Sequence, residues 1–364
     1  MWVVLDANVF CADYHLAGSA FRVFLDSLRR LDLRCRVPEV VLEEVLARRK
    51  RELDEIARQV KKSNRSWRRI TGTSLGGPTA DELDANSEEY ARVLARAFQE
   101  HDIVVVPYPE VSHDFLVKKA VQRRKPFKQS GDGYRDALIW ASVVSLAQQH
   151  REPLAFVTNN KSDFGTTPNL HHDLVAELEP GAQVSLYNSL EQFNADRVLP
   201  NLKHLENVLR EMQENRHQFS VQTWIAAAMA DVLNTSDDAC YFVDLEPGHG
   251  HAWVSSVKNQ GTATIDDVRL LGSGELLVLA NVDLTLEVSV SADWEDCDRY
   301  PDIRGFFGGD CSGHPTAWVE REGNVAFTLT LNAKSFEVEW CDIDQIRCEF
   351  FTVDINPHPR RGRE

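Results

Sequence analysis

The hydrophobic period of the sequence changes near residue 239, and this change limits the possible folds more than any other feature. Before it, short apolar runs such as 2–5, 103–107 and 154–158 alternate with segments whose apolar residues have helical spacing. After it, apolar and polar residues alternate one by one. The first pattern is typical of a mostly parallel sheet covered by helices, and the second is typical of antiparallel strands. The chain should therefore contain two different folds.

The two patterns predict the domain organisation. We expect a three-layer α/β domain with a mostly parallel sheet at residues 1–197, followed by a helical bridge at 198–236. An antiparallel β-rich domain, either a sandwich or a barrel, should occupy residues 237–356, and 357–364 should be a disordered tail. In the β-rich half, the alternation predicts strands at 252–258, 282–290, 324–332, 335–340 and 347–353.

The net charge is divided unevenly between the halves. Residues 1–219 contain 30 Lys and Arg against 31 Asp and Glu, a net charge of −1, whereas residues 220–357 contain 7 against 24, a net charge of −17. The last seven residues add +2, which gives −16 for the 364-residue chain. A strongly acidic domain is a poor match for nucleic acid, so we expect it to serve regulation or to bind a protein partner.

Several classes of protein do not fit the sequence. No window approaches 18 consecutive apolar residues, and the start, MWVVLDANVF, has no basic or cleavable segment, so we expect neither a membrane span nor export. Seven cysteines without a CxxC pair favour a reduced, cytoplasmic setting. The CSGH run at 311–314 has a plausible spacing for zinc ligands, but no second close pair supports it. The chain has neither a Walker loop nor a GxSxG motif, which argues against an NTPase and a serine hydrolase.

Acidic residues stand where the strands and helices of the α/β half meet. Asp6 ends the first strand, and Asp163 follows a later one. Glu44 lies early in a long helix, and Asp136 opens another in GYRDALIW. Ligand sites of open α/β sheets lie at the carboxyl ends of the strands, and carboxylates that converge there repel one another unless a cation neutralises them. Hard oxygen ligands of this kind suit Mg²⁺ or Mn²⁺.

These motifs, taken in order, resemble those of PIN-domain nucleases. The resemblance rests on the runs VLDANVF, RDALIW and VTNNKSDF and on Pro38 followed by Glu44 six positions later, and it covers roughly residues 1–195. More narrowly, GYRDALIW is similar to a segment of a bacterial PIN-like group. The resemblance implies metal-dependent hydrolysis of phosphodiester bonds, usually in RNA. It also implies metal-binding roles for the acids at matching positions, which are Asp6, Glu44, Asp136 and Asp163.

Some of these assignments have rivals close by. Glu43 precedes Glu44 and points about 100° away from it on a helix, and the offset from Pro38 favours Glu44. Asp132 is a rival or helper of Asp136. Many relatives of the family have an acid where this chain has Asn160, which adds no charge. We assign the positioning of substrate or metal-bound water to Asn8, Arg135, Thr158 and Asn160, although an ion pair with a neighbouring acid explains Arg135 equally well.

Two basic segments fit a polyanionic substrate. Residues 48–69 contain ten cations against three acids, and residues 118–128 contain six cations and no acid. Such clusters bind phosphates with release of counterions, although a solvated helix face is the commoner role of a charge run. Trp67 and Phe127 add aromatic rings on which bases can stack. Within the second segment, we assign substrate binding to Arg123, Arg124 and Lys125.

Together, these features favour a metal-dependent endonuclease that uses Mg²⁺ or Mn²⁺, with RNA favoured over DNA as its substrate. The alternatives are a DNA nuclease and a PIN fold that binds nucleic acid, or assembles complexes, without catalysis. The family's roles as toxins, in RNA processing and in phage defence are not separated by the sequence. It also leaves open whether the chain forms a homo-oligomer.

Overall fold

The computed structural model describes residues 1–150, 152–214, 243–244, 251–291, 308–309, 315–333, 338–348 and 351–354. The chain divides into two compact units, Met1–Leu202 and Lys203–Glu364. Within the described ranges, no helix is both long enough and apolar enough to cross a membrane.

A parallel five-stranded sheet forms the centre of the first unit, in the order β3-β2-β1-β4-β7. β1 and β4 are buried at every position, which explains why they are unbroken apolar runs and not alternating ones. The predicted α/β fold with a parallel sheet is therefore confirmed. The strands are β1 (Trp2–Leu5), β2 (Arg34–Pro38), β3 (Val104–Val106), β4 (Leu154–Val157) and β7 (Val184–Tyr187).

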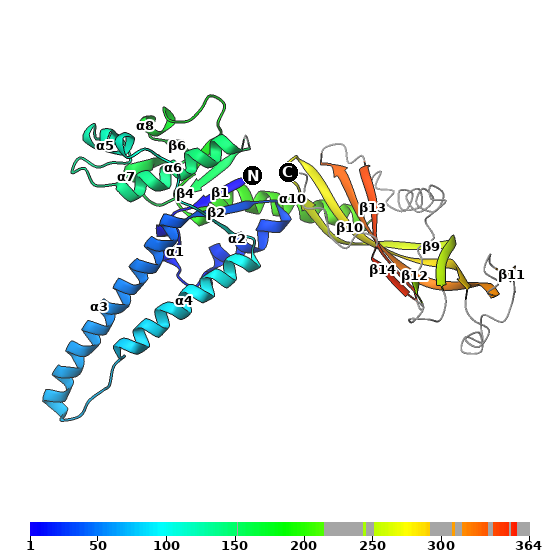
Figure 1. The fold of residues 1–364 in the computed structure, drawn as a ribbon, viewed down its shortest axis with the longest axis horizontal. Coiled ribbons are helices and arrows are strands. Elements are labelled where there is room, and N and C mark those ends of the chain that lie inside the picture. The colour runs from blue at the N-terminus through cyan, green and yellow to red at the C-terminus, as the bar shows by residue number, and fades with distance from the viewer. Residues whose placement is uncertain are drawn as a thin grey trace. The chain divides into compact units, whose positions relative to one another are not determined.

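Helices connect these strands and pack against the sheet (Figure 1). In the core, the ring of Trp140 lies 6.5 Å from that of Phe156 in β4, and Phe24 lies 5.9 Å from Phe193. A short antiparallel hairpin is formed by β5 (Gly165–Thr166) and β6 (Asn169–Leu170). The helices are α1 (Ala7–Ala12), α2 (Ser19–Arg30), α5 (His113–Val121), α6 (Tyr134–Gln149), α7 (Lys161–Phe164), α8 (His172–Val175), α9 (Leu190–Phe193) and the π-helix Asn194–Val198.

Two long helices, α3 (Glu39–Thr71) and α4 (Ala80–Glu100), form a hairpin that extends away from the sheet (Figure 1). Pro38 directly precedes the first turn of α3, and Gly72 ends the helix in a left-handed conformation with φ of 72°, which glycine adopts without strain. Thr79 and Glu82 form a capping box at the start of α4. The buried residues of α3 lie in its first two turns, so the distal part of the hairpin exposes its cations to solvent.

The second unit contains an antiparallel sheet in the order β14-β13-β12-β10-β9-β8, with β11 (Gly308–Gly309) paired to β12. Every second residue of β10 from Leu276 to Leu286 is buried, as the alternating sequence predicts. The antiparallel β-rich half is therefore confirmed. The strands are β8 (Val243–Asp244), β9 (His251–Leu270), β10 (Glu275–Ser291), β12 (Pro315–Asn332), β13 (Val338–Cys348) and β14 (Phe351–Asp354).

The strands are longer than the alternation predicts. β9 continues twelve positions beyond the expected end at residue 258, because register shifts between β9 and β10 absorb the breaks in alternation. The expected strand at 347–353 spans the end of β13 and the start of β14, with 349–350 outside the described residues. Residues 334–337 also lie outside them.

The expected bridge and tail are described only in part. α10 (Leu199–Gln213) is helical, as the pattern of its sequence indicates, and it buries Leu205, Val208 and Met212. The remainder of the expected bridge, at 215–236, lies outside the described residues, as does the expected tail at 357–364.

Candidate active site

Four acidic side chains from distant parts of the first unit converge beyond the carboxyl ends of the sheet strands. Asp6 directly follows β1, and Asp163 lies in α7, just after β4. Glu44 lies in the second turn of α3, which follows β2, and Asp136 lies in the first turn of α6. Because β2, β1 and β4 are parallel neighbours, their carboxyl ends meet at one edge of the sheet.

Asp6 is the most constrained of the four acids. Its Oδ1 accepts a hydrogen bond from the backbone N of Ala7 at 2.6 Å, so it caps α1. Its Oδ2 accepts from the Thr158 hydroxyl and from Nδ2 of Asn8, both at 2.5 Å. A side chain that is buried and bonded on both oxygens is held in one orientation, which suits a ligand and not a solvated surface acid.

The charges of the four acids act on one another. The pKa of Asp6 is raised to about 6, chiefly by burial and to a smaller extent by the charges of Asp136 and Glu44, against the lowering effect of its hydrogen bonds. Burial also raises the pKa of Asp136, with contributions from Asp163 and Glu44. The apo site therefore concentrates negative charge, which a bound cation would relieve.

Helix phase separates Glu44 from its neighbour Glu43. Oε1 of Glu44 accepts a hydrogen bond from Arg135 at 2.9 Å, and its charge acts on Asp6 and Asp136. Glu43 instead accepts from the Tyr108 hydroxyl at 2.7 Å. The structure thus brings Glu44, and not Glu43, to the acid cluster, and it pairs Arg135 with Glu44.

Asp163 is 1% exposed and faces two lysines. Nζ of Lys125 lies 3.1 Å from its Oδ1, and Nζ of Lys128 lies 3.8 Å from its Oδ2. Asp132, the rival of Asp136, lies in the exposed loop before α6 and accepts a hydrogen bond from Ser130. Asp136, and not Asp132, is therefore the acid of this segment whose charge acts on Asp6.

Asn160 connects two of the acids. Its Nδ2 donates to Oδ1 of Asp136 at 3.2 Å and to Oδ2 of Asp163 at 3.0 Å. Its backbone N donates to the Thr158 hydroxyl oxygen, which is also an acceptor for Nδ2 of Asn8. An amide here supplies two donors between carboxylates, so it offsets part of their repulsion without a charge of its own.

The basic segment 118–128 is less exposed than its composition suggests. Lys119 is 3% exposed and forms an ion pair with Glu177 at 2.8 Å, and Lys125 forms an ion pair with Asp163. Arg123 is exposed, and its guanidinium donates to Gln129. Phe127 is 3% exposed, so the expectation that bases stack on it is wrong: the ring is packed in a small core with Leu116 and Ala137.

Trp67 is 44% exposed on the distal part of α3, so its ring is accessible. The CSGH run at 311–314, whose spacing suits zinc ligands, lies outside the described residues.

The structure also reveals a group that the sequence analysis missed. Within the described ranges, one group of three His, Cys, Asp or Glu residues has ligand atoms within 4.8 Å of one another: His171, His172 and Asp173. Nothing but their adjacency as HHD in the sequence signals it. Since this is the one such group in the described ranges, no three of the four acids of the candidate site have ligand atoms within 4.8 Å of one another.

This spacing still fits a divalent cation. Mg²⁺ keeps several water ligands and binds through one or two carboxylates, so its site does not need tightly packed oxygens. The donor set consists of hard carboxylate oxygens, and two of the acids have raised pKa values that a cation would lower. The residues present therefore suit Mg²⁺ or Mn²⁺.

A model of the PIN domain family matches residues 3–164, a range that contains all four acids. No curated protein and no solved structure matches the chain. PIN domains are typically nucleases, and they generally use divalent metal ions. The narrower similarity of GYRDALIW to a bacterial group stays a prediction. The parallel sheet agrees with the matched range, and residues 3–164 of this chain are similar to the PIN-domain family.

Proposed function

We propose that this protein is a metal-dependent endonuclease that hydrolyses phosphodiester bonds, with RNA as the favoured substrate. The observation that carries the proposal is the convergence of acids from four separate segments, Asp6, Glu44, Asp136 and Asp163, at the strand ends. Gathering carboxylates there lowers the stability of the apo protein, and a bound divalent cation offsets this cost.

In this proposal, the four acids hold one or two Mg²⁺ or Mn²⁺ ions. When bound, the metal lowers the pKa of a water molecule and polarises the scissile phosphate. Thr158, Asn8 and Asn160 orient the carboxylates through the hydrogen bonds described above. Arg135 and Lys125 pair with Glu44 and Asp163, and they would be free to contact phosphate oxygens if a metal neutralised those acids.

We propose a different role for the acidic second unit, as a regulatory or partner-binding module. Residues 220–357 carry a net charge of −17, which repels a polyanion and suits a basic protein surface. We further propose that the nuclease acts in the cytoplasm, in RNA processing, as a toxin or in phage defence.

A cleavage assay tests the proposed activity. Single-stranded RNA, duplex RNA and single-stranded DNA are incubated with the full chain in Mg²⁺, Mn²⁺ or EDTA. We expect cleavage of RNA with either metal and none in EDTA. Asp136→Asn should abolish cleavage, whereas Asp132→Asn, the same change four positions away in the exposed loop, should retain it.

Three other outcomes would contradict the proposal. Cleavage of DNA alone would favour the DNA nuclease. Binding of RNA without cleavage under any metal would favour a non-catalytic PIN fold. If Asp136→Asn cleaves as well as Asp132→Asn does, the acid cluster takes no part in the reaction.

A further inference from the structure

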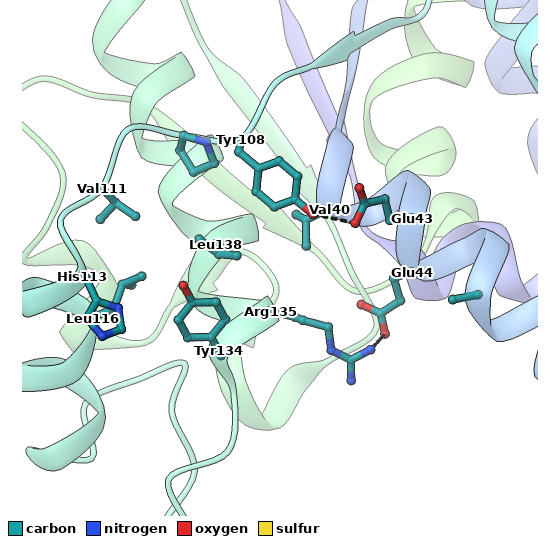
Figure 2. A pocket seen from close by; sticks show the side chains of 12 residues that line it. Val40, Glu43, Glu44, Tyr108, Val111, His113, Leu116, Tyr134, Arg135 and Leu138 are labelled. Carbon is teal, nitrogen blue, oxygen red and sulfur yellow. Dashed lines mark hydrogen bonds and ion pairs between the residues drawn. The ribbon is translucent and has the colours of Figure 1, made fainter.

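A cleft of about 550 Å³ opens beside Glu44, between the start of α3, the segment after β3 and the start of α6 (Figure 2). Its lining includes the apolar side chains of Val40, Val111, Leu116 and Leu138. Volumes of several hundred Å³ with an apolar interior and a few polar groups are typical of sites for small organic ligands. The lining therefore suits a largely apolar group with a few polar atoms.

Two tyrosines present their rings at this cleft. Tyr108 is 41% exposed and Tyr134 is 50% exposed, and Figure 2 shows them on either side of Leu138. The hydroxyl of Tyr108 donates to Glu43, which restrains the ring although much of it is open to solvent. Exposed aromatic rings in fixed positions are the usual platforms on which nucleobases stack.

The cleft adjoins the acid cluster and a second groove that is lined by arginines and glutamates. Glu44 and Arg135 line the cleft, and they also line a second groove of about 520 Å³ that runs along α3. That groove contains Arg48, Arg51 and Arg58 together with Glu52 and Glu55, which pair with Arg48 and Arg58. Carboxylates, aromatic rings and guanidinium groups therefore meet at Glu44, where the proposed function puts the scissile phosphate.

We propose that the Tyr108–Tyr134 cleft binds an unpaired base of the nucleic-acid substrate, next to the cleaved bond, while the arginine groove binds the phosphates that follow. The inference rests on the proposed function and adds a substrate class to it, because a base inside a duplex is covered on both faces by its neighbours. A tyrosine ring reaches only a base that has left the stack. The site thus selects single-stranded nucleic acid.

Binding measurements test the cleft. A fluorescent single strand, the same strand in a duplex, and a sugar–phosphate strand without bases are titrated with the full chain carrying Asp6→Asn, in Mg²⁺. Adding Tyr134→Leu should weaken binding of the single strand about 10-fold, because one base loses the ring on which it stacks. Binding of the duplex and of the baseless strand should not change. Tyr134→Phe, which keeps the ring, should bind like the parent.

Two further variants serve as a second test and as a control. Tyr108→Leu should have the same effect as Tyr134→Leu without altering the helix that carries Asp136. Trp340→Leu removes a ring of similar exposure, 44%, from the second unit and should change nothing. Thermal unfolding of each variant identifies any that fails to fold.

Cleavage by the wild-type chain, followed in parallel, separates the two proposals. Tyrosine-dependent binding of the single strand without any cleavage leaves the base site standing and overturns the nuclease. If the wild-type chain cleaves, but both Leu variants bind the single strand as tightly as their parent, only the base site is overturned. Equal weakening on the baseless strand also overturns it, because the tyrosines then act on the backbone. A chain that binds none of the strands overturns both.

Discussion

The hydroxyl of Thr158 donates a 2.5 Å hydrogen bond to Oδ2 of Asp6, across 152 positions of the sequence. The two residues follow β4 and β1, which are adjacent strands of the parallel sheet. This hydrogen bond ties two strand ends together at the acid cluster, and it holds a buried carboxylate whose charged form the protein otherwise disfavours.

The raised pKa of Asp6 predicts a specific pH dependence of stability. Between its ordinary pKa of 3.8 and the folded value of about 6, the folded chain holds a proton that the unfolded chain has lost. Without metal, the free energy of unfolding should therefore fall as pH rises through this window, by up to about 3 kcal/mol, and then level off.

Asp6→Asn removes that titration. Measured in urea with EDTA from about pH 4 to about pH 7, the variant should gain stability relative to wild type as pH rises. Mg²⁺ should reduce the difference, since a cation stabilises the charged form of Asp6. A difference that stays constant across the range would mean that Asp6 titrates normally in the folded chain.

Asn160→Asp tests the amide that lies between two acids. The change removes the donors to Asp136 and Asp163 and adds a third carboxylate beside them. We expect a loss of about 2–4 kcal/mol in the metal-free free energy of unfolding, and a larger stabilisation by Mg²⁺ than in wild type.

Asn159→Asp is the matched control, because the side chain of Asn159 is exposed and the change adds the same charge one position away. Its metal-free stability should change by less than about 0.5 kcal/mol. Similar losses in the two variants would assign the effect to net charge and not to the two hydrogen bonds of Asn160.

The cations of segment 118–128 should separate into two classes. Arg123 is exposed, and no ion pair involves it or Arg124 in the described part of the chain, so both are available to phosphate. Replacing both with Ala should make the dependence of nucleic-acid affinity on salt shallower, by about 0.7 for each phosphate of a single strand that the variant no longer neutralises. An unchanged slope would assign both arginines to a solvated surface.

Lys125→Met should act differently, because Lys125 is the nearer of the two cations that face the buried carboxylate of Asp163. Without metal, its loss should destabilise the chain by about 3 kcal/mol, since the acid keeps only the more distant Lys128. Saturating Mg²⁺ should restore most of the loss, measured as the shift in the urea midpoint. A loss that Mg²⁺ does not reduce would argue against a metal on Asp163.

The sequence predicted the parallel sheet and the four acids because both follow from local signals. Unbroken apolar runs mark buried parallel strands, and an acid directly after such a run falls at the carboxyl edge of the sheet. The offset from Pro38 favoured Glu44 over Glu43, and in the structure the two side chains contact different neighbours.

What the sequence could not predict depends on tertiary packing. Phe127 and Lys119 stand in a run of cations, so nothing local shows that one is packed in a core and the other is paired with Glu177. The cleft beside Glu44 brings Tyr108 and Tyr134 together from segments 26 positions apart. No spacing rule marks such a pair, because the fold sets their distance.

The acidic second unit leads to the last prediction. A shortened chain ending at Glu214 keeps the parallel sheet, the four acids and all of α10. It also removes the region of net charge −17, so the remaining chain should bind nucleic acid more tightly at low salt, with the difference disappearing as salt screens the charge. Affinity and cleavage are measured beside the full chain. If the chain ending at Glu214 folds and binds metal but cuts nothing that the full chain cuts, the acidic unit is part of the catalytic machinery and not a separate module.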